Sequence, residues 1–372
     1  MARRVAVVHS FYDSSTPSGE NEVVLDQTRL LERQGNEVHR VWRRTDEMSE
    51  RPLYMATSAW RVATGRDSSI HDELREIDPD VVLLHNTFPN LGTNWLQTYG
   101  AQTISTLHNY RTVCAAGTLF RDGQPCTLCV NTRTINAVKH GCYRSRAASV
   151  PLAIATHRTG SLQSILRLSK HVVVLNESAR TFFEPRTTGA VHLIPNFTRR
   201  ISITTTKRRR GWVFAGRLTH EKGLRQLLEN WPSDELLSIY GAGSREAEYK
   251  SVTKKLPNVT WCGTVPRAVL REALARAEGL LVPSLWQEGI PTVAIEALAV
   301  GTPVAFGPAV TSANGFVGAG AGVLLDPYRS ESVRAALGDM RRSDRSACLK
   351  YFNRMFTEDV WLAKMGALMD SI

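Results

Sequence analysis

The sequence has no long hydrophobic run. A membrane-spanning helix needs roughly 18 or more apolar residues, and no stretch of this chain comes close to that length. The apolar run that begins at Val5 follows a basic start, but it is too short for a signal peptide and is better explained as a first strand. Internal repeats and long low-complexity segments are also missing, which excludes a repeat architecture. We therefore expect a cytoplasmic protein without a membrane span.

Acidic residues are in the minority. The chain has 46 Lys and Arg against 35 Asp and Glu, which gives a net charge of +11 and a pI near 9.6. Such a balance favours anionic partners, namely phosphates, acidic membrane surfaces or nucleic acid. No aromatic-rich nucleic-acid motif accompanies the basic residues, which are spread along the chain, so the sequence disfavours nucleic acid.

The length of 372 residues exceeds what one ordinary hydrophobic core supports. We expect a first domain at 1–197 and a second at 211–355, joined by a Thr- and Arg-rich linker at 198–210. The remaining segment, 356–372, is expected to form a helix that can pack back on the first domain. A hydrophobic content of 42% fits two folded domains.

Short β-branched runs alternate with helical patterns along the whole chain, which is typical of an α/β fold with parallel sheets. Two doubly wound domains of this kind are expected to face each other across a cleft, with the ligand at the carboxyl ends of their strands. The expected strands are 5–9, 37–41, 81–84, 103–107, 172–175 and 191–194 in the first half, and 212–215, 237–240, 259–262, 280–282, 303–306 and 322–325 in the second.

The segment from Pro283 to Glu296 is the most informative part of the sequence. The apolar run at 279–282 reads as a buried strand, Pro291 is well placed to open a helix, and the Gly-Thr-Pro at 301–303 ends it. The backbone N–H groups of Gly289, Ile290 and Thr292 would then lie at a helix N-terminus beside the edge of a sheet. Such a position binds phosphate.

Two carboxylates, Glu288 and Glu296, flank that turn eight positions apart. A phosphate would repel both, so they fit better as acceptors for neutral hydroxyl groups on either side of it. This arrangement points to a nucleotide sugar. In the alternative interpretation, Glu288 caps the turn and Glu296 is a solvated helix residue.

Two cations, Arg217 and Lys222, follow the expected strand at 212–215. A guanidinium and an ammonium at a strand exit can neutralise a departing diphosphate without a metal ion, although two cations on a solvated loop are a common alternative. After the next strand, Gly241 and Gly243 would let the backbone approach a ligand closely. A tight turn explains those glycines equally well.

The first half offers a loop and a histidine as candidates. A helix is expected to begin near Gly19, where free amides could hold a second phosphate or the acceptor, or where an ordinary loop simply joins strand to helix. Two strand ends carry a histidine, and we expect His108 to orient a sugar hydroxyl or stabilise charge. For His85 and His9 we expect structural roles.

Four of the six cysteines fall within an insert at 114–142, namely Cys114, Cys126, Cys129 and Cys142. Disulfides are not expected without a secretion signal. The four thiolates could hold a structural zinc, and four reduced thiols packed in a loop are the alternative. In either case we expect the insert to help form the acceptor site.

Together these residues resemble the retaining glycosyltransferase family 4, whose members have the GT-B architecture of two Rossmann-like domains. The most specific elements are the segment from Gly216 through Arg217 to Lys222 and the turn from Glu288 to Glu296, and the resemblance covers nearly the whole chain. Gly19 matches the N-terminal glycine loop of the family. His108 matches its cleft histidine less closely.

The resemblance implies transfer of a sugar from a nucleotide diphosphate with retention at the anomeric carbon and without a bound metal. By the same resemblance, Arg217 and Lys222 would hold the diphosphate, Glu288 would contact the sugar, and Glu296 would bind the ribose hydroxyls. The amides of 289–292 would contact the sugar and phosphate. Here Ile290, Pro291 and Thr292 replace the more frequent Phe-Gly-Leu type of turn, which leaves the donor sugar open.

The predicted function is therefore sugar transfer from a UDP- or GDP-linked donor to a glycan, lipid-linked or small-molecule acceptor. The cysteine insert resembles that of some bacterial family members that build surface or exported polysaccharides, and the basic charge could hold the enzyme at the inner face of the membrane. Two alternatives remain open: a nucleotide-sugar epimerase or phosphorylase on the same fold, and a non-catalytic protein that binds anionic polymers.

Overall fold

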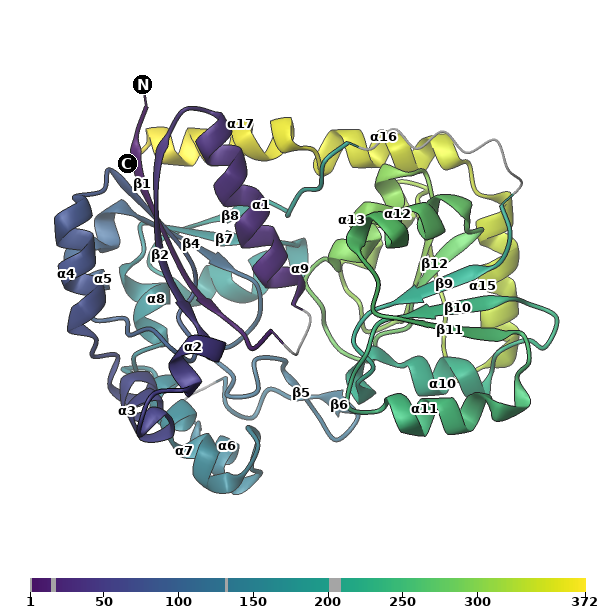
Figure 1. Cartoon of the computed structure of the whole chain (residues 1–372), viewed down its shortest axis with the longest axis horizontal. Helices are drawn as coiled ribbons and strands as arrows, with labels where there is room; N and C mark the ends of the chain where they lie inside the picture. The colour runs from purple at the N-terminus through teal and green to yellow at the C-terminus, as the bar shows by residue number, and fades with distance from the viewer. Residues whose placement is uncertain (1, 15–17, 131–132, 201–208) are drawn as a thin grey trace. The chain divides into compact units, whose positions relative to one another are not determined.

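The computed structural model describes residues 2–14, 18–130, 133–200 and 209–372. The chain divides into two compact units (Figure 1). The first comprises Met1–Ile194 and Leu362–Ile372, and the second comprises Pro195–Trp361. Most of the expected linker at 198–210 falls outside the described residues.

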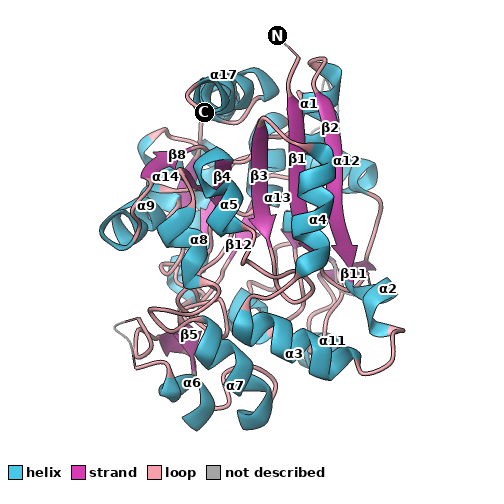
Figure 2. Cartoon of the chain, turned by 90° about the vertical axis from the view of Figure 1, so that its left-hand side faces the viewer, coloured by secondary structure: helices cyan, strands magenta, loops and turns pink. Residues whose placement is uncertain are grey.

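The first unit is built on a six-stranded sheet in the order β2-β1-β3-β4-β7-β8, in which every pair is parallel. Parallel strands have helices on their faces, as Figure 2 shows for this sheet. The central strands are accordingly apolar and buried along their length. The strands are β1 (Arg4–Phe11), β2 (Glu37–Arg44), β3 (Val81–Asn86), β4 (Thr103–Leu107), β7 (His171–Val174) and β8 (Ala190–Leu193).

Helices connect these strands, and a short antiparallel hairpin, β5 (Phe120–Arg121) with β6 (Gln124–Pro125), lies inside the cysteine insert. The hairpin was not expected, because a two-residue strand carries no hydrophobic period in the sequence. The helices of this unit are α1 (Gly19–Arg33), α2 (Thr45–Ser49), α3 (Tyr54–Thr64), α4 (Ser68–Ile77), α5 (Leu96–Tyr99), α6 (Ile135–Lys139), α7 (Arg146–Ala155), α8 (Gln163–Leu168) and α9 (Glu177–Phe183), with 3-10 turns at Gly100–Gln102 and Glu184–Arg186.

The second unit repeats this design with a parallel sheet in the order β11-β10-β9-β12-β13-β14. Its strands are β9 (Trp212–Ala215), β10 (Leu237–Tyr240), β11 (Val259–Gly263), β12 (Gly279–Val282), β13 (Val304–Phe306) and β14 (Gly322–Leu324). Its helices are α10 (Leu224–Glu229), α11 (Glu246–Val252), α12 (Arg267–Arg276), α13 (Thr292–Ala299), α14 (Ala313–Gly318), α15 (Ser330–Arg342) and α16 (Arg345–Met355), with 3-10 turns at His220–Lys222 and Thr253–Lys255.

The last helix, α17 (Glu358–Asp370), runs from the second unit into the first. Its end is held on the first unit by an ion pair between Arg3 and Asp370 and by a hydrogen bond between His171 Nε2 and the Ser371 hydroxyl at 2.9 Å. These contacts attach the C-terminus to the amino ends of β1 and β7. None of the described helices is both long and apolar enough to cross a bilayer.

All twelve expected strands are present, with ends that agree to within three residues. The α/β fold with two doubly wound sheets is therefore confirmed. The expectation held because parallel strands buried on both faces give short, continuous β-branched runs that contrast with the longer helical period between them.

The core of the first unit contains neutral histidines. His9 lies in β1, is fully buried, and has its Nε2 3.1 Å from the Asn21 side-chain oxygen. Burial lowers the pKa of His9 to about 4, because the charged imidazolium loses its hydration there. This agrees with the structural role expected of His9.

We expect the buried imidazole of His9 to make the first unit sensitive to acid. Its pKa is lower in the folded than in the unfolded chain, so its contribution to stability is complete above pH 6.5 and is lost as the pH falls toward 4. Because of this protonation of His9, the free energy of unfolding should drop by about 3 kcal/mol. Urea denaturation at several pH values should show a smaller drop for His9→Gln than for wild type. The exposed His157→Gln is the control, and equal drops in all three proteins would contradict the prediction.

Candidate functional site

Three loops of the second unit leave the sheet at its carboxyl edge, after β9, β10 and β12. Because the strands are parallel, these loops emerge on the same side of the sheet. The N–H of Leu218 in the first loop donates to Ala242 O in the second at 3.0 Å, and the N–H of Leu285 in the third donates to Glu221 O at 2.9 Å. Backbone hydrogen bonds thus join all three loops.

Two glycines allow this close approach. Gly223 has a φ of +69°, and a Cβ at this position would lie 2.0 Å from the carbonyl oxygen of Pro283. Gly241 has a φ of +120°, and its Cβ would lie 2.0 Å from Gly216 O. Any larger residue would therefore separate the loops, so both glycines are required by the geometry of this edge.

The contact at Gly223 brings Lys222 against Glu288. The ammonium nitrogen lies 2.8 Å from Glu288 Oε1, and both side chains are largely buried. The same oxygen accepts hydrogen bonds from the Ser284 hydroxyl and, at 3.2 Å, from the Trp286 indole N–H. The carboxylate is thus held by several donors in one orientation, which is what a residue that positions a ligand requires.

Arg217 lies on the same edge but is half exposed. Its guanidinium is 3.7 Å from Glu221 Oε1, and that oxygen also accepts a hydrogen bond from the Thr219 hydroxyl at 2.7 Å. A pair of this length at the surface is weak. The guanidinium can therefore exchange Glu221 for an incoming anion at little cost.

Glu296 lies on α13 and is buried. The interpretation of Glu296 as a solvated helix residue is therefore wrong. Its carboxylate pairs with Arg267 and with Arg271, the latter at 3.3 Å, and Arg271 also donates to the Thr198 hydroxyl at 3.0 Å. The sequence analysis missed both arginines, although their spacing of four residues places them on one face of a helix.

The helix α13 begins at Thr292, directly after Pro291, as the sequence predicted. The N–H of Ala294 donates to Pro291 O at 2.9 Å, whereas the N–H groups of Thr292 and Val293, ahead of it, have no partner within the helix itself. Gly289 lies in the turn that leads into it, while Ile290 is buried in the core of the unit. Gly243 lies on the neighbouring loop, where a Cβ would come 2.6 Å from Leu218 O. Backbone amides and the Lys222–Glu288 pair thus belong to one sheet edge.

His108 lies at the end of β4 in the first unit. Its Nε2 is 3.0 Å from His85 Nδ1, and the two rings stack with centroids 5.3 Å apart. Burial, with a smaller contribution from His9, lowers the pKa of His108 to about 3, so the imidazole is neutral at pH 7. A small cavity is lined by His85, His108 and Arg111. At this position a neutral imidazole can exchange hydrogen bonds with a hydroxyl but cannot supply positive charge.

Glu20 was missed by the sequence analysis, which singled out its neighbour Gly19 at the first position of α1. Burial raises the pKa of Glu20 to about 7, and the positive charge of Arg111 opposes the shift. Asn109 donates to one carboxylate oxygen at 3.4 Å. The other oxygen is buried without a hydrogen-bond partner among the described residues. The sequence did contain a signal for Glu20, because it is an acidic residue in the first turn of a helix that starts at a sheet edge.

The four clustered cysteines are free and half buried. Burial raises the pKa of Cys129 to about 11, and the charges of Cys114, Cys142 and Cys126 add to the rise, so the four sulfurs lie within electrostatic reach of one another. Among the described residues, however, no three His, Cys, Asp or Glu side chains form a group that could hold a metal. The structural zinc stays a prediction.

Comparison with known proteins agrees with these features. Residues 199–347 match the family described as glycosyl transferases group 1. No curated protein sequence matches the chain. Among solved structures, a sucrose-phosphate synthase from Thermosynechococcus elongatus is similar over 99% of this chain and 98% of its own, with a TM-score of 0.72 and 16% identity.

Two further structures cover both chains almost completely. WaaG, a glycosyltransferase involved in lipopolysaccharide biosynthesis, has a TM-score of 0.64 at 15% identity over 99% of each chain. The Anabaena protein HepE, solved in complex with UDP, has a TM-score of 0.62 at 13% identity over 100% of each chain. The chain therefore has the two-domain GT-B fold of these proteins, and its residues 199–347 match the glycosyl transferases group 1.

Proposed function

We propose that this protein is a retaining glycosyltransferase that uses a nucleotide-diphosphate sugar and works in the biosynthesis of a surface polysaccharide or glycoconjugate. The observation that carries the proposal is the Lys222–Glu288 pair at the carboxyl edge of the second sheet, with Glu288 four residues before the start of α13. The pair combines a cation, an oriented carboxylate and backbone amides. A sugar joined to a phosphate needs this combination.

In the proposed complex, Lys222 and Arg217 neutralise the diphosphate together with the N–H groups of Gly289, Ile290 and Thr292. Two cations supply the positive charge that the departing diphosphate requires, so we propose transfer without a metal ion. Glu288 accepts hydrogen bonds from the donor sugar. Glu296 accepts them from the ribose hydroxyls, while its paired arginines fix the carboxylate in place.

The proposed reaction breaks the bond between the anomeric carbon and the diphosphate oxygen and forms a bond to an acceptor hydroxyl on the same face of the sugar. The transition state resembles an oxocarbenium ion, and the leaving phosphate takes the acceptor proton. No carboxylate of the enzyme has to act as a nucleophile. Positive charge beside the leaving group is then the main contribution of the protein.

The donor is proposed to carry UDP or GDP, and the acceptor to be a glycan or a lipid-linked sugar. Support for the nucleotide comes from HepE, which was solved with UDP. Support for the acceptor class comes from WaaG, which is involved in lipopolysaccharide biosynthesis. On the acceptor side, we propose that His108 and Glu20 of the first unit receive hydrogen bonds from hydroxyl groups.

Calorimetric titration with UDP, GDP and ADP tests the donor proposal. We expect wild type to bind UDP or GDP selectively and Arg217→Ala to bind the same nucleotide at least tenfold more weakly, because a charge-assisted phosphate contact contributes about 1.5–3 kcal/mol. Arg329→Ala, an exposed arginine at the start of α15, is the control. If wild type binds none of the three nucleotides, the proposal fails and binding of anionic polymers becomes the better explanation.

Lys222→Ala should lower the rate of transfer by roughly a hundredfold or more, because one preorganised cation at a leaving group is worth that much. Lys250→Ala removes an exposed lysine that pairs with Glu246 at 2.7 Å, and this variant should keep the wild-type rate. Thermal unfolding of both variants separates a lost fold from a lost charge. Isomerised sugar or sugar phosphate formed without an acceptor would instead favour the epimerase or phosphorylase.

Glu20→Gln should stabilise the protein while lowering transfer to the acceptor. The pKa of Glu20 is higher in the folded than in the unfolded chain, so its stabilising contribution is present below about pH 4.5 and is lost as the pH rises through 7. The gain in the free energy of unfolding of Glu20→Gln over wild type should therefore be about 1 kcal/mol larger at pH 8 than at pH 5. Glu22→Gln, exposed on the same helical turn, is the matched control. Unchanged transfer by Glu20→Gln would remove Glu20 from the acceptor side.

A further inference from the structure

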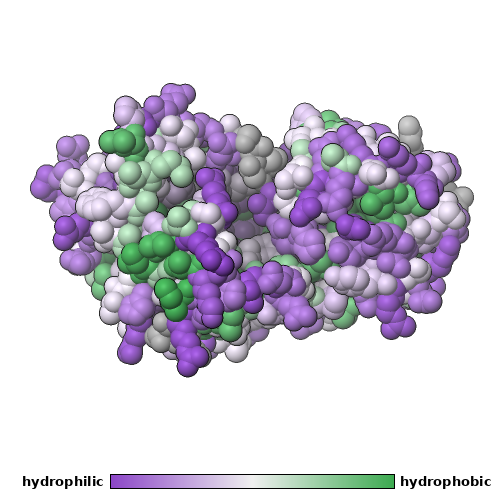
Figure 3. Space-filling model, turned by 90° about the horizontal axis from the view of Figure 1, so that it is seen from below, coloured by the Kyte–Doolittle hydropathy of each residue, from purple (hydrophilic) through white to green (hydrophobic). Residues whose placement is uncertain are grey.

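The surface of the first unit carries apolar side chains that no described part of the chain covers. On α3 and the turn before it, Leu53 is 78% exposed, Met55 67% and Trp60 53%. On α7, which contacts α3, Val150 is 41% and Ile154 51% exposed. Figure 3 shows hydrophobic surface bordered by hydrophilic residues on this unit. We call these five residues the α3–α7 face.

The exposed positions follow from the helical period. Val150 and Ile154 are four residues apart on α7, so they share one side of the helix, while Leu152 and Ala155 of the same helix are buried. Both helices thus bury one apolar side and expose a second. The exposed side of a helix on a soluble protein usually carries mostly polar and charged residues. On α7, Arg146 shares the exposed side with Val150 and Ile154, so this side combines a positive charge with apolar side chains.

The two stretches of sequence that supply the face carry charge of one sign. Between Asp122 and Glu177 the sequence has no acidic residue, and it also has none between Glu50 and Asp67. The longer of these stretches supplies α6 and α7, and the shorter supplies α3. The exposed basic residues on them are Arg51, Arg66, Arg133, Lys139, Arg144, Arg146, Arg158 and Arg167.

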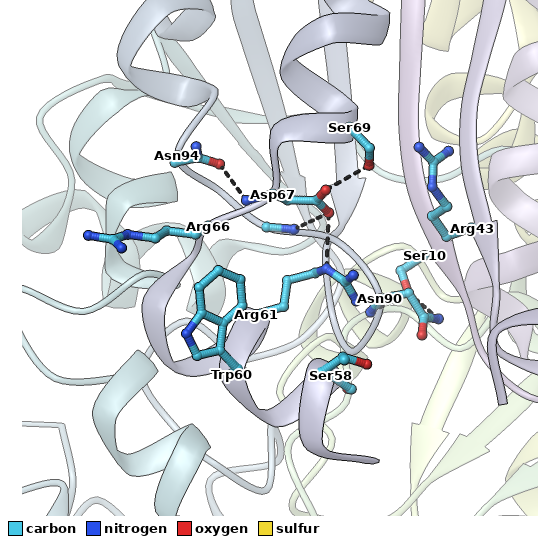
Figure 4. Close-up of polar contacts among 12 residues, drawn as sticks. Ser10, Arg43, Ser58, Trp60, Arg61, Arg66, Asp67, Ser69, Asn90 and Asn94 are labelled. Atoms are coloured by element: carbon cyan, nitrogen blue, oxygen red, sulfur yellow. Dashed lines mark hydrogen bonds and ion pairs between the residues drawn. The ribbon is translucent and has the colours of Figure 1, made fainter. Parts of the chain in front are cut away.

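The acidic residue nearest the end of α3 does not weaken this pattern. Asp67 is buried and lies 3.2 Å from Arg61 Nε, and it also accepts hydrogen bonds from the Ser69 hydroxyl at 2.7 Å and from the Gly92 N–H at 3.2 Å (Figure 4). Its charge is therefore compensated internally. Trp60 takes no part in these contacts (Figure 4), so its indole is available to a partner.

We propose that the α3–α7 face docks on the surface of a bilayer that contains anionic lipids. Apolar side chains, one of them a tryptophan, would enter the boundary between headgroups and acyl chains, and the surrounding arginines and lysines would contact lipid phosphates. Nucleic acid matches the charge but offers nothing to cover Leu53, Met55 or Val150. With no described helix able to span a bilayer, the contact lies in the plane of the interface.

This proposal does not depend on glycosyl transfer, because the α3–α7 face contains none of the residues that are proposed to bind donor or acceptor. Docking on a bilayer would place the enzyme on the same surface as a lipid-linked acceptor. Failure of vesicle binding would leave the nucleotide titration unaffected. The two proposals can therefore fail separately.

Co-sedimentation of the full chain with vesicles tests the docking surface. We expect binding to phosphatidylcholine vesicles that contain phosphatidylglycerol, weaker binding to pure phosphatidylcholine, and a decrease with added salt. The double variant Trp60→Ser with Ile154→Ser should bind at least tenfold more weakly, because two apolar side chains no longer enter the interface. Arg146→Glu should bind about tenfold more weakly, and it is compatible with the fold because an acidic residue suits the first turn of α7.

The controls replace matched residues on the second unit. Tyr328 and Leu324 are 58% and 53% exposed, so the double variant Tyr328→Ser with Leu324→Ser removes comparable exposed side chains, and Arg329→Glu reverses one exposed charge. These variants should bind vesicles as wild type does. Equal binding to both kinds of vesicle, or equal binding by Trp60→Ser with Ile154→Ser and by wild type, would overturn the proposal. A dimer in solution that this variant dissociates would overturn it too, and would assign the face to a second copy of the chain.

Discussion

The candidate site depends on the contact between two loops of the second sheet, where the backbone at Gly223 touches the carbonyl of Pro283. Only a glycine with positive φ fits there, and this fit brings the Lys222 ammonium to 2.8 Å from the Glu288 carboxylate. The Ser284 hydroxyl and the Trp286 indole then complete the carboxylate's environment. One backbone constraint thus determines the position of both charged groups. A cation and a carboxylate that are already oriented lose little entropy when a ligand arrives.

The candidate site residues of the two units differ in how their charge is compensated. In the second, each buried glutamate has cationic partners: Lys222 for Glu288, and Arg267 with Arg271 for Glu296. In the first, His9 and His108 are kept neutral by burial, and Glu20 is an acid whose pKa approaches neutrality. Paired charges suit an anionic donor that needs fixed countercharge, whereas groups that are neutral or nearly so suit hydroxyl groups of an acceptor. This contrast agrees with the proposed division of work between the units.

The basic residues of the chain fall into two groups in the structure. Some are paired with buried carboxylates: Arg267 and Arg271 pair with Glu296, and Arg61 pairs with Asp67, so these cations add little positive charge to the surface. The stretch between Asp122 and Glu177 is different, because it contains no acid to compensate its arginines and lysines. Net charge alone pointed to several classes of anionic partner. The location of the uncompensated charge beside exposed Leu53, Trp60 and Ile154 is what favours a lipid surface.

The sequence by itself determined the twelve strands, the start of α13 after Pro291, and the loops that carry Arg217, Lys222 and Glu288. Hydrophobic period, proline and glycine are local signals, and they act on neighbouring residues of the chain. Only the tertiary structure decided that Lys222 meets Glu288, that Glu296 is buried between two arginines of α12, and that Glu20 lies beside Asn109 and Arg111. These partners are up to 89 residues apart in sequence. Their meeting depends on strand order and on loop packing, which leave no periodic trace in the sequence, and their protonation depends on burial that arises only when the sheets and helices pack.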